Sequence, residues 1–187
     1  LAGSAHLLAG GDYTPSDESG DANKFTQALA VQARRLGVDF RLNTTVDRIV
    51  AEGDAIFGIA TTGPAGSALL KADAYVVALG SYSPLLLRPL GIDLPVIPAK
   101  GYSATVRLRE DGGAPTVSLT DDEHRLVFSR LGDRLRIAGT AEFNGYNLEL
   151  NAVRCAALMR RTQQLFPDLK AVGDPEFWCG LRPTTPS

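Results

Sequence analysis

The sequence has only two cysteines, Cys155 and Cys179, and only two histidines, His6 and His124. Two widely spaced cysteines cannot build a disulfide framework or a zinc cluster, so we expect free thiols and a reducing compartment. Neither histidine lies near a serine or cysteine in a nucleophile motif, which argues against a hydrolytic triad. Residues 121–124 join acidic groups to a histidine, but consecutive turn residues point in different directions. We therefore expect a solvated turn there and no metal site.

Long apolar runs and an excess of basic charge are also lacking. No run reaches the length of a membrane helix, and no segment resembles a signal peptide. The net charge of −2 over 187 residues provides no concentrated basic face, so we expect no nucleic-acid partner. Hydrophobic residues make up 44% and charged residues 21%, which predicts a folded protein with a core. Because the chain starts at Leu1 rather than Met and stops abruptly at Ser187, we expect an internal portion of a longer protein.

The first half of the sequence predicts mixed α and β structure. A helix is expected after Asp21 as N-cap, with an apolar face that packs, and Gly37 is expected to end it. The other expected elements are a strand over 38–43, extended chain over 44–50, a hairpin from 55–61 and 67–72, and a strand over 74–79. Residues 74–79 are continuously apolar and precede Gly80, which indicates a strand buried on both faces of a parallel sheet.

The second half is predicted to be an antiparallel sheet followed by one helix. Alternating apolar residues indicate strands at 103–108, 117–120, 125–130 and 134–139. A helix should begin at Asn151 and stop at Pro167, with one face formed by Cys155, Leu158, Met159, Thr162, Leu165 and Phe166.

The stretch from Phe177 to Pro186 contains the strongest candidate for a binding residue. Arg182 stands between the Gly180-Leu181 pair and Pro183, a setting that suits neither a helix nor a central strand, so we expect it on a turn in a buried pocket. A fixed guanidinium offers paired donors that match a carboxylate. From these residues alone, an arginine that satisfies loop carbonyls is the more common alternative.

Four segments together resemble a known family. They are TPSDESGD at 14–21, ADAYVVALGSYS at 72–83, KGYS at 100–103 and FWCGLRPTTP at 177–186. In order and spacing they resemble the FAD-dependent amine and amino-acid oxidoreductases of the D-amino-acid oxidase type, including the bacterial dehydrogenases of D-amino acids. The resemblance covers nearly the whole chain.

The resemblance implies FAD as cofactor and a D-amino acid as substrate, which hydride transfer from Cα to the flavin would convert into an imino acid and then a 2-oxo acid. Arg182 resembles the arginine that pairs with the substrate carboxylate. Val46 resembles a position at the adenine end of the flavin, and Gly80 and Ser81 resemble a second flavin-contacting turn, with Gly180 grouped among the cofactor-binding positions. Some members use a tyrosine beside the substrate, and the nearest candidates are Tyr102 and Tyr146, although a structural role is the more common one for tyrosine.

The implied fold class is mixed α+β and α/β, with a partial FAD-binding domain of the glutathione-reductase-like type and an antiparallel-sheet substrate domain. Residues 1–94 would form the partial FAD-binding domain, with part of the substrate region at 1–20. Residues 95–175 would form the substrate domain, and 176–187 would return to the FAD domain. The family's glycine-rich pyrophosphate motif, G-x-G-x-x-G, is absent from the sequence, so we expect this chain alone to bind FAD weakly or not at all and to be inactive.

Two alternative functions stay open at this point. The same fold would serve a glycine- or sarcosine-type amine oxidase, and a sheet that has lost its chemistry would serve as a binding module. The electron acceptor cannot be read from the residues. A cytoplasmic location is expected, with peripheral association at the inner face of the bacterial inner membrane left open for the intact enzyme.

Overall fold

The chain divides into two compact units in the computed structural model, which describes residues 2–110 and 112–186. Unit 1 comprises Leu1–Phe25 and Pro98–Arg182, and unit 2 comprises Thr26–Ile97 and Pro183–Ser187. The sequence placed a boundary at 94/95, close to the division after Ile97. Part of residues 1–20 was expected in the substrate region, and residues 1–25 belong to the same unit as the antiparallel sheet, as do residues 176–182, which were expected in the other domain. The functional assignment of the two domains stays a prediction.

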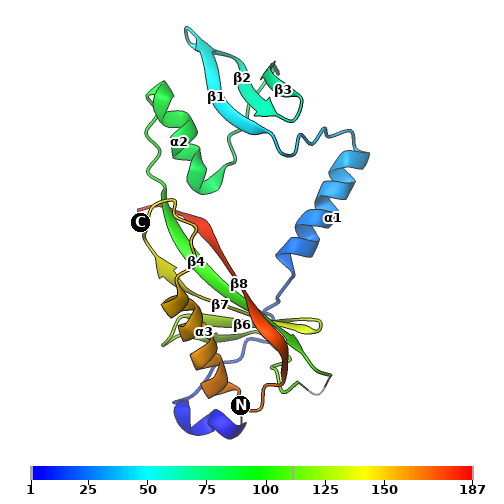
Figure 1. Ribbon diagram of the computed structural model, residues 1–187, viewed down its shortest axis with the longest axis vertical. Helices are drawn as coiled ribbons and strands as arrows, with labels where there is room; N and C mark the ends of the chain where they lie inside the picture. Colours follow the sequence, from blue (N-terminus) through cyan, green and yellow to red (C-terminus); the bar gives the residue numbers. More distant parts are fainter. Residues whose placement is uncertain (1, 111, 187) are drawn as a thin grey trace. The chain divides into compact units, whose positions relative to one another are not determined.

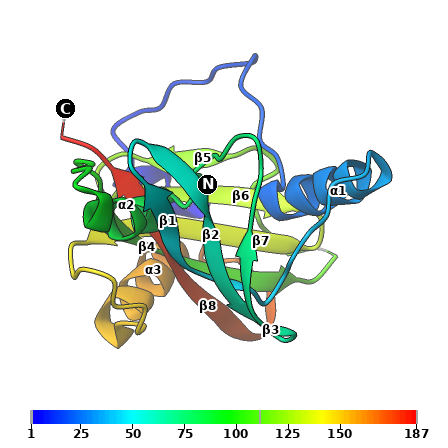
Figure 2. The same cartoon turned by 90° about the horizontal axis from the view of Figure 1, so that it is seen from above.

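Unit 1 is built on a five-stranded sheet in the order β5-β6-β7-β4-β8 (Figures 1 and 2). The strands are β4 (Ile97–Leu108), β5 (Leu119–Asp121), β6 (Leu126–Leu131), β7 (Arg134–Glu142) and β8 (Ala171–Thr184). The pairs β5–β6, β6–β7 and β4–β7 are antiparallel. This confirms the expected antiparallel sheet in the second half of the sequence.

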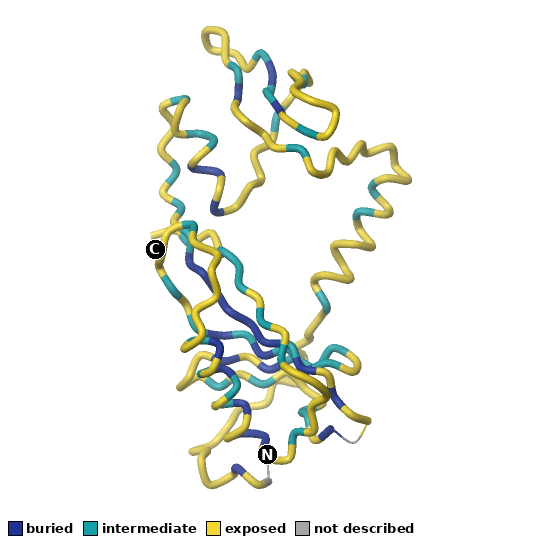
Figure 3. The backbone as a smooth tube through the Cα atoms, in the orientation of Figure 1, coloured by how far each residue is buried: buried dark blue, intermediate teal, exposed yellow. Residues whose placement is uncertain are grey.

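The core of unit 1 lies between this sheet and helix α3 (Ala152–Leu165). Asn151 caps the helix, since its Oδ1 accepts hydrogen bonds from the backbone N–H groups of Val153 and Arg154. The predicted helical face is confirmed, and the side chains that join it in the core come from alternate positions of β4, β6 and β7. Figure 3 shows buried stretches of the backbone in this part of the chain. The principal sheet contributions are Tyr102, Ala104, Val106, Leu126, Phe128, Leu135 and Ile137. The short helix η1 (Ala2–Leu7) is tied to α3 by a 2.7 Å hydrogen bond from Ser4 Oγ to Leu165 O.

Helix α1 (Ala22–Arg35) begins and ends as the sequence predicts, but its apolar face does not pack. Asp21 Oδ1 accepts from the N–H groups of Asn23 and Lys24, and Gly37 has a φ of 92°. Phe25 is 69% exposed and Leu29 is 56% exposed, and no residue of α1 is buried. The expectation of a packed face was therefore wrong for this chain. No helix in the described part is long and apolar enough to cross a membrane.

Unit 2 contains a three-stranded sheet of β1 (Thr45–Glu52), β2 (Ala55–Gly63) and β3 (Gly66–Leu70). Both pairings are antiparallel, which confirms the hairpin and the extended segment before it. The strand expected over 38–43 is not formed, since regular pairing begins only at Thr45. After this sheet come η2 (Gly80–Tyr82), α2 (Ser83–Leu87) and η3 (Arg88–Leu90).

Residues 74–79, predicted to be a buried parallel strand, form no strand at all. Val76 is 89% exposed and Leu79 is 42% exposed. A strand needs a hydrogen-bonded neighbour, and no strand of residues 2–110 or 112–186 pairs with this segment. The segment has the apolar composition of a strand buried on both faces, but no described residues bury it.

Candidate functional site

An open pocket of about 340 Å³ lies on the sheet of unit 1. Three neighbouring strands supply its lining residues: Gly101, Tyr102 and Ser103 from β4, Arg136 and Ala138 from β7, and Trp178, Gly180, Leu181 and Arg182 from β8. The pocket is therefore formed entirely within one unit. The helix α3 packs with the opposite, core-forming side chains of the same strands.

Strand alternation explains why these residues share a face. Successive side chains of a strand point to opposite sides of a sheet, so burying Leu135 and Ile137 in the core turns Arg136 and Ala138 away from it. In β8, Phe177 and Cys179 pack against the core, which leaves Trp178, Gly180 and Arg182 for the pocket face. The core pattern thus determines which residues can meet a ligand.

Arg182 lies within strand β8 and is exposed, so the expectation of a turn in a buried pocket was wrong. The strand tolerates Pro183 because β8 is the last strand of the sheet, where one side of the backbone needs no hydrogen-bonded partner. Placement on a strand fixes the backbone of Arg182 more firmly than a loop would. The side chain projects from an ordered edge into an open pocket.

Two glycines allow the large pocket side chains to lie close to the sheet. A Cβ atom at Gly101 would overlap the guanidinium of Arg182, so this guanidinium rests directly over the backbone of β4. A Cβ atom at Gly180 would overlap the ring of Trp178 and approach its Cζ2 atom to 2.8 Å. The guanidinium carbon of Arg136 lies 5.6 Å from the centroid of the same ring.

The pocket carries positive charge and an unused hydroxyl group. Among the described residues, no carboxylate forms an ion pair with Arg136 or Arg182. Ser103 is 3% exposed, and its Oγ atom has no hydrogen-bond partner. Two guanidinium groups and a free hydroxyl are donors for an anion, and a planar carboxylate matches the paired donors of arginine.

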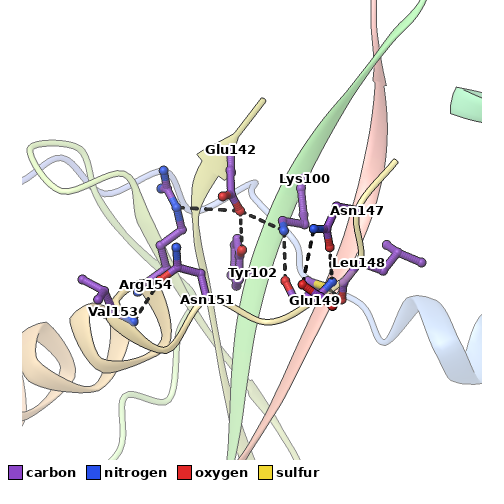
Figure 4. A network of polar contacts seen from close by, with 10 residues as sticks. Lys100, Tyr102, Glu142, Asn147, Leu148, Glu149, Asn151, Val153 and Arg154 are labelled. Carbon is purple, nitrogen blue, oxygen red and sulfur yellow. Dashed lines mark hydrogen bonds and ion pairs between the residues drawn. The ribbon is translucent and has the colours of Figure 1, made fainter. Parts of the chain in front are cut away.

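A charged network lies at the end of β4 beside this pocket (Figure 4). The buried Lys100 Nζ is 2.9 Å from Glu142 Oε2 and donates a 2.9 Å hydrogen bond to Glu149 O. The hydroxyl of Tyr102 also donates to Glu142. Burial raises the pKa of Tyr102, and the hydrogen bond to Glu142 raises the pKa of Lys100, so both groups stay protonated donors. Tyr102 lines the pocket, but its hydroxyl is engaged by Glu142.

This network predicts an acid-dependent loss of stability. The hydrogen bonds from Tyr102 and Lys100 hold the pKa of Glu142 below its ordinary value of 4.5. Because the folded pKa is depressed, the stabilisation is present above 4.5 and is lost as the pH falls through the folded value. Melting curves of the chain should show a steep decline in Tm below that pH. Glu142→Gln should melt lower at neutral pH and decline less steeply.

Glu176→Gln is the matched control for that experiment, because Glu176 is an exposed acid on β8. Its melting temperature should follow the wild-type pH profile. A Glu142→Gln profile parallel to the wild type would show that this network does not contribute the pH dependence.

Of the residues singled out in the sequence, three line the pocket and four are not among its lining residues. Arg182, Tyr102 and Gly180 all line it. Tyr146 is half-buried in a bridge with Asn144 and does not line it. The flavin-related positions belong to unit 2: Val46 lies in β1, and Gly80 and Ser81 lie in η2. Their roles stay predictions.

Gly101, Ser103 and Arg136 were missed as site residues in the sequence. Each is separated by an odd number of positions from the apolar core residues of its strand, so its side chain or Cα hydrogens point to the face of the sheet opposite the core. That alternation was visible for β4, but the register that aligns β4 with β7 was not. The ladder pairs Ser103 with Ala138 and Thr105 with Arg136, and this pairing assembles the pocket.

The acidic turn and the cysteines lie outside this pocket. Arg161 donates a 2.6 Å hydrogen bond to Asp121. Burial, the largest single influence, would raise the pKa of Asp121, but the hydrogen bonds from Arg161 and the backbone N–H of His124, together with the charge of Arg161, lower the pKa overall. Cys155 and Cys179 are free thiols, and burial raises the pKa of Cys155. The described residues contain no group of three His, Cys, Asp or Glu side chains placed to hold a metal ion.

Comparison with known proteins identifies a family and a set of close relatives. A family model described as FAD dependent oxidoreductase (DAO) matches residues 2–187. A D-amino acid dehydrogenase from Dechloromonas aromatica (strain RCB) is 69% identical over 188 residues, which cover 100% of this chain and 45% of that protein. Another from Paramagnetospirillum magneticum is 53% identical over 179 residues, covering 96% of this chain and 42% of that protein. The chain thus spans less than half the length of these relatives.

Solved structures show the same fold. Glycine oxidase from Bacillus cereus superimposes with a TM-score of 0.72 at 27% identity, over 87% of this chain and 43% of that one. An L-proline dehydrogenase from P. horikoshii gives a TM-score of 0.72 at 19% identity, over 88% of this chain and 43% of that one, and shows likeness of fold alone.

Proposed function

Because the chain belongs to the DAO family of FAD-dependent oxidoreductases, we propose that the whole protein oxidises D-amino acids to imino acids, which water converts to 2-oxo acids. The pocket on the sheet would receive the amino acid, with Arg182 bound to its carboxylate. The observation that carries this proposal is a guanidinium on a strand, in an open pocket, that forms no ion pair with the described residues. Relatives that are 69% and 53% identical are named D-amino acid dehydrogenases, which supports the choice of substrate.

The chemistry needs orientation more than acid or base catalysis. FAD, when bound, supplies a two-electron acceptor for the hydride that leaves the substrate Cα. Arg182 would hold the substrate carboxylate so that the Cα–H bond keeps one orientation toward the flavin. Binding energy is thereby used to reach a geometry that favours hydride transfer. Trp178 forms an apolar wall and limits where the substrate side chain can lie. No pocket residue is a carboxylate that could repel the substrate.

The residues of unit 2 partly fit a flavin. Gly80 has a φ of 54°, and a Cβ atom placed there would meet only Pro183 Cγ, at 3.8 Å, so its backbone is open to a close approach. Val46 is 38% exposed on β1, and the ladder is irregular directly after it. We propose that these backbones contact FAD, with Ser81 beside Gly80. The glycine-rich motif that would hold the pyrophosphate is absent from the sequence.

We expect the purified chain to contain no stoichiometric flavin, because it lacks that pyrophosphate cradle. The measurement is the visible flavin absorbance of the chain after purification and after incubation with excess FAD and gel filtration. A stoichiometric yellow complex would contradict the expectation. A cooperative melting curve of the same preparation controls for a failure to fold.

A glycine or other amine oxidase is the second candidate, since a glycine oxidase at 27% identity shares the fold over 87% of the chain. Assays of the whole protein with D-alanine, L-alanine and glycine would separate these functions. We expect reduction of an artificial electron acceptor with D-alanine and little peroxide. Preferential peroxide formation from glycine would favour the second candidate, and turnover of L-alanine alone would contradict the proposal.

Two further proposals concern the electron acceptor and the cellular location of the whole protein. We propose an acceptor other than oxygen, and a cytoplasmic protein that attaches peripherally to the inner membrane. Separation of cells into soluble and membrane fractions, followed by a salt wash of the membranes, tests the attachment. Release of the protein by salt would support it, and a protein found only in the soluble fraction would not.

A further inference from the structure

The most unusual polar group in the pocket is the hydroxyl of Ser103. Ser103 is 3% exposed and its Oγ atom has no hydrogen-bond partner. Buried polar groups in folded proteins nearly always have a partner, so an unpartnered one that lines a pocket indicates a bound ligand or water. The expected helper for the substrate, Tyr102, has its hydroxyl committed to Glu142. Ser103 is the neighbouring residue on the other face of β4.

The position of Ser103 relative to Arg182 suits a single carboxylate. The guanidinium of Arg182 rests over Gly101, and Ser103 is two residues further along the same face of β4. Two residues of a strand span roughly 7 Å. A carboxylate that accepts one hydrogen bond of about 2.8 Å at each oxygen bridges two donors at about this separation. The two groups can therefore hold opposite oxygens of the same carboxylate.

We propose that the hydroxyl of Ser103 donates a second hydrogen bond to the α-carboxylate of the substrate, opposite Arg182. The proposal rests on the proposed function and adds a binding residue to it. Arg136 lies further away, beside Trp178, and its ladder partner is Thr105, two residues beyond Ser103. Its charge adds to the positive potential of the pocket.

Ser103→Ala in the whole protein tests the proposal. The hydroxyl makes no internal hydrogen bond, so its removal should leave the melting temperature unchanged. A lost hydrogen bond to a charged carboxylate should raise KM about tenfold for every D-amino acid, including D-norvaline and D-glutamate. Ser103→Thr, which keeps a hydroxyl, should restore part of the affinity.

Thr140→Val is the matched control, because Thr140 Oγ1 is the other buried side-chain atom without a partner in the described chain and does not line the pocket. Its KM should equal that of the wild type. An unchanged KM in Ser103→Ala would overturn the proposal. An increase confined to D-glutamate would also overturn it, since it would place Ser103 with Arg136 at the substrate side chain. A wild-type protein that oxidises no D-amino acid would instead overturn the proposed function itself.

Discussion

Arg182→Ala should lower kcat/KM for D-amino acids by more than about 100-fold, chiefly through KM. In the whole protein the bound substrate and FAD would enclose this charge pair, and removal of one partner from an enclosed pair costs about 3 kcal/mol or more, because the carboxylate is left without its matching donor. Arg182 forms no ion pair with the described residues, so the change should leave the melting temperature of the protein almost unaltered. Steady-state kinetics with D-alanine and a melting curve measure the two effects.

Two companion variants make that result specific. Arg182→Lys keeps the charge but loses the planar paired donors, so it should fall between the wild type and Arg182→Ala. Arg107→Ala removes an exposed arginine of β4 that lies outside the pocket and should leave the kinetics unchanged. Wild-type kinetics in Arg182→Ala would eliminate this residue as the carboxylate ligand.

Gly101→Ala should have the second-largest effect, a loss of about 100-fold in kcat/KM with little loss of stability. The added methyl group would occupy the place of the Arg182 guanidinium, and a displacement of about 1 Å at a positioning residue can have an effect of this size. The atoms it meets belong to the flexible end of a side chain, which can move away. Kinetics and melting temperature, measured on the same preparation, separate misplacement from unfolding.

Gly139→Ala provides the contrasting control in the same sheet. A methyl group there would meet Leu126 and approach the backbone Arg125 O to 2.8 Å, which cannot move without disturbing the strand. It should lower the melting temperature and leave KM of the folded enzyme unchanged. The contrary result is that Gly101→Ala destabilises the protein as much as Gly139→Ala does. In that case close packing of the sheet, and not the position of the Arg182 guanidinium, would explain why residue 101 lacks a side chain.

A double-mutant cycle shows whether Gly101 acts through Arg182. Once Arg182 has been replaced by Ala, the added methyl group at Gly101 has no guanidinium to displace. Gly101→Ala should therefore cost nothing further in the Arg182→Ala background. Additive losses of the two changes would show that Gly101 contributes to binding independently.

Local patterns predicted most of unit 1, because its helix and strands bury their apolar faces within the described chain. Asn151 and the face from Cys155 to Phe166 signalled α3 correctly, and alternation in β4 separated core from pocket residues. The edge position of β8 could not be predicted, since it depends on strand order, and Pro183 therefore suggested a turn. Arg136 could not be predicted as a pocket residue either, because its place beside the pocket depends on the register between β4 and β7.

The failures at α1 and at residues 74–79 share a different cause. Phe25 and Leu29 of α1 and the apolar segment 74–79 have the composition of buried elements, yet they are exposed. An apolar composition shows that a segment can be buried, but burial also requires another element to pack against it. The described residues do not bury these segments. The relatives are more than twice as long as this chain, which covers 45% of the first and 42% of the second.

The central claim is that Arg182 holds the substrate carboxylate, and a structure of the whole protein with a bound D-amino acid, its flavin kept reduced so that the substrate is not oxidised, tests it most directly. The account predicts that the carboxylate oxygens lie about 2.7–2.9 Å from the guanidinium nitrogens of Arg182, within the pocket of β4, β7 and β8. A carboxylate bound elsewhere, with Arg182 turned to solvent or paired with a protein acid, would contradict it.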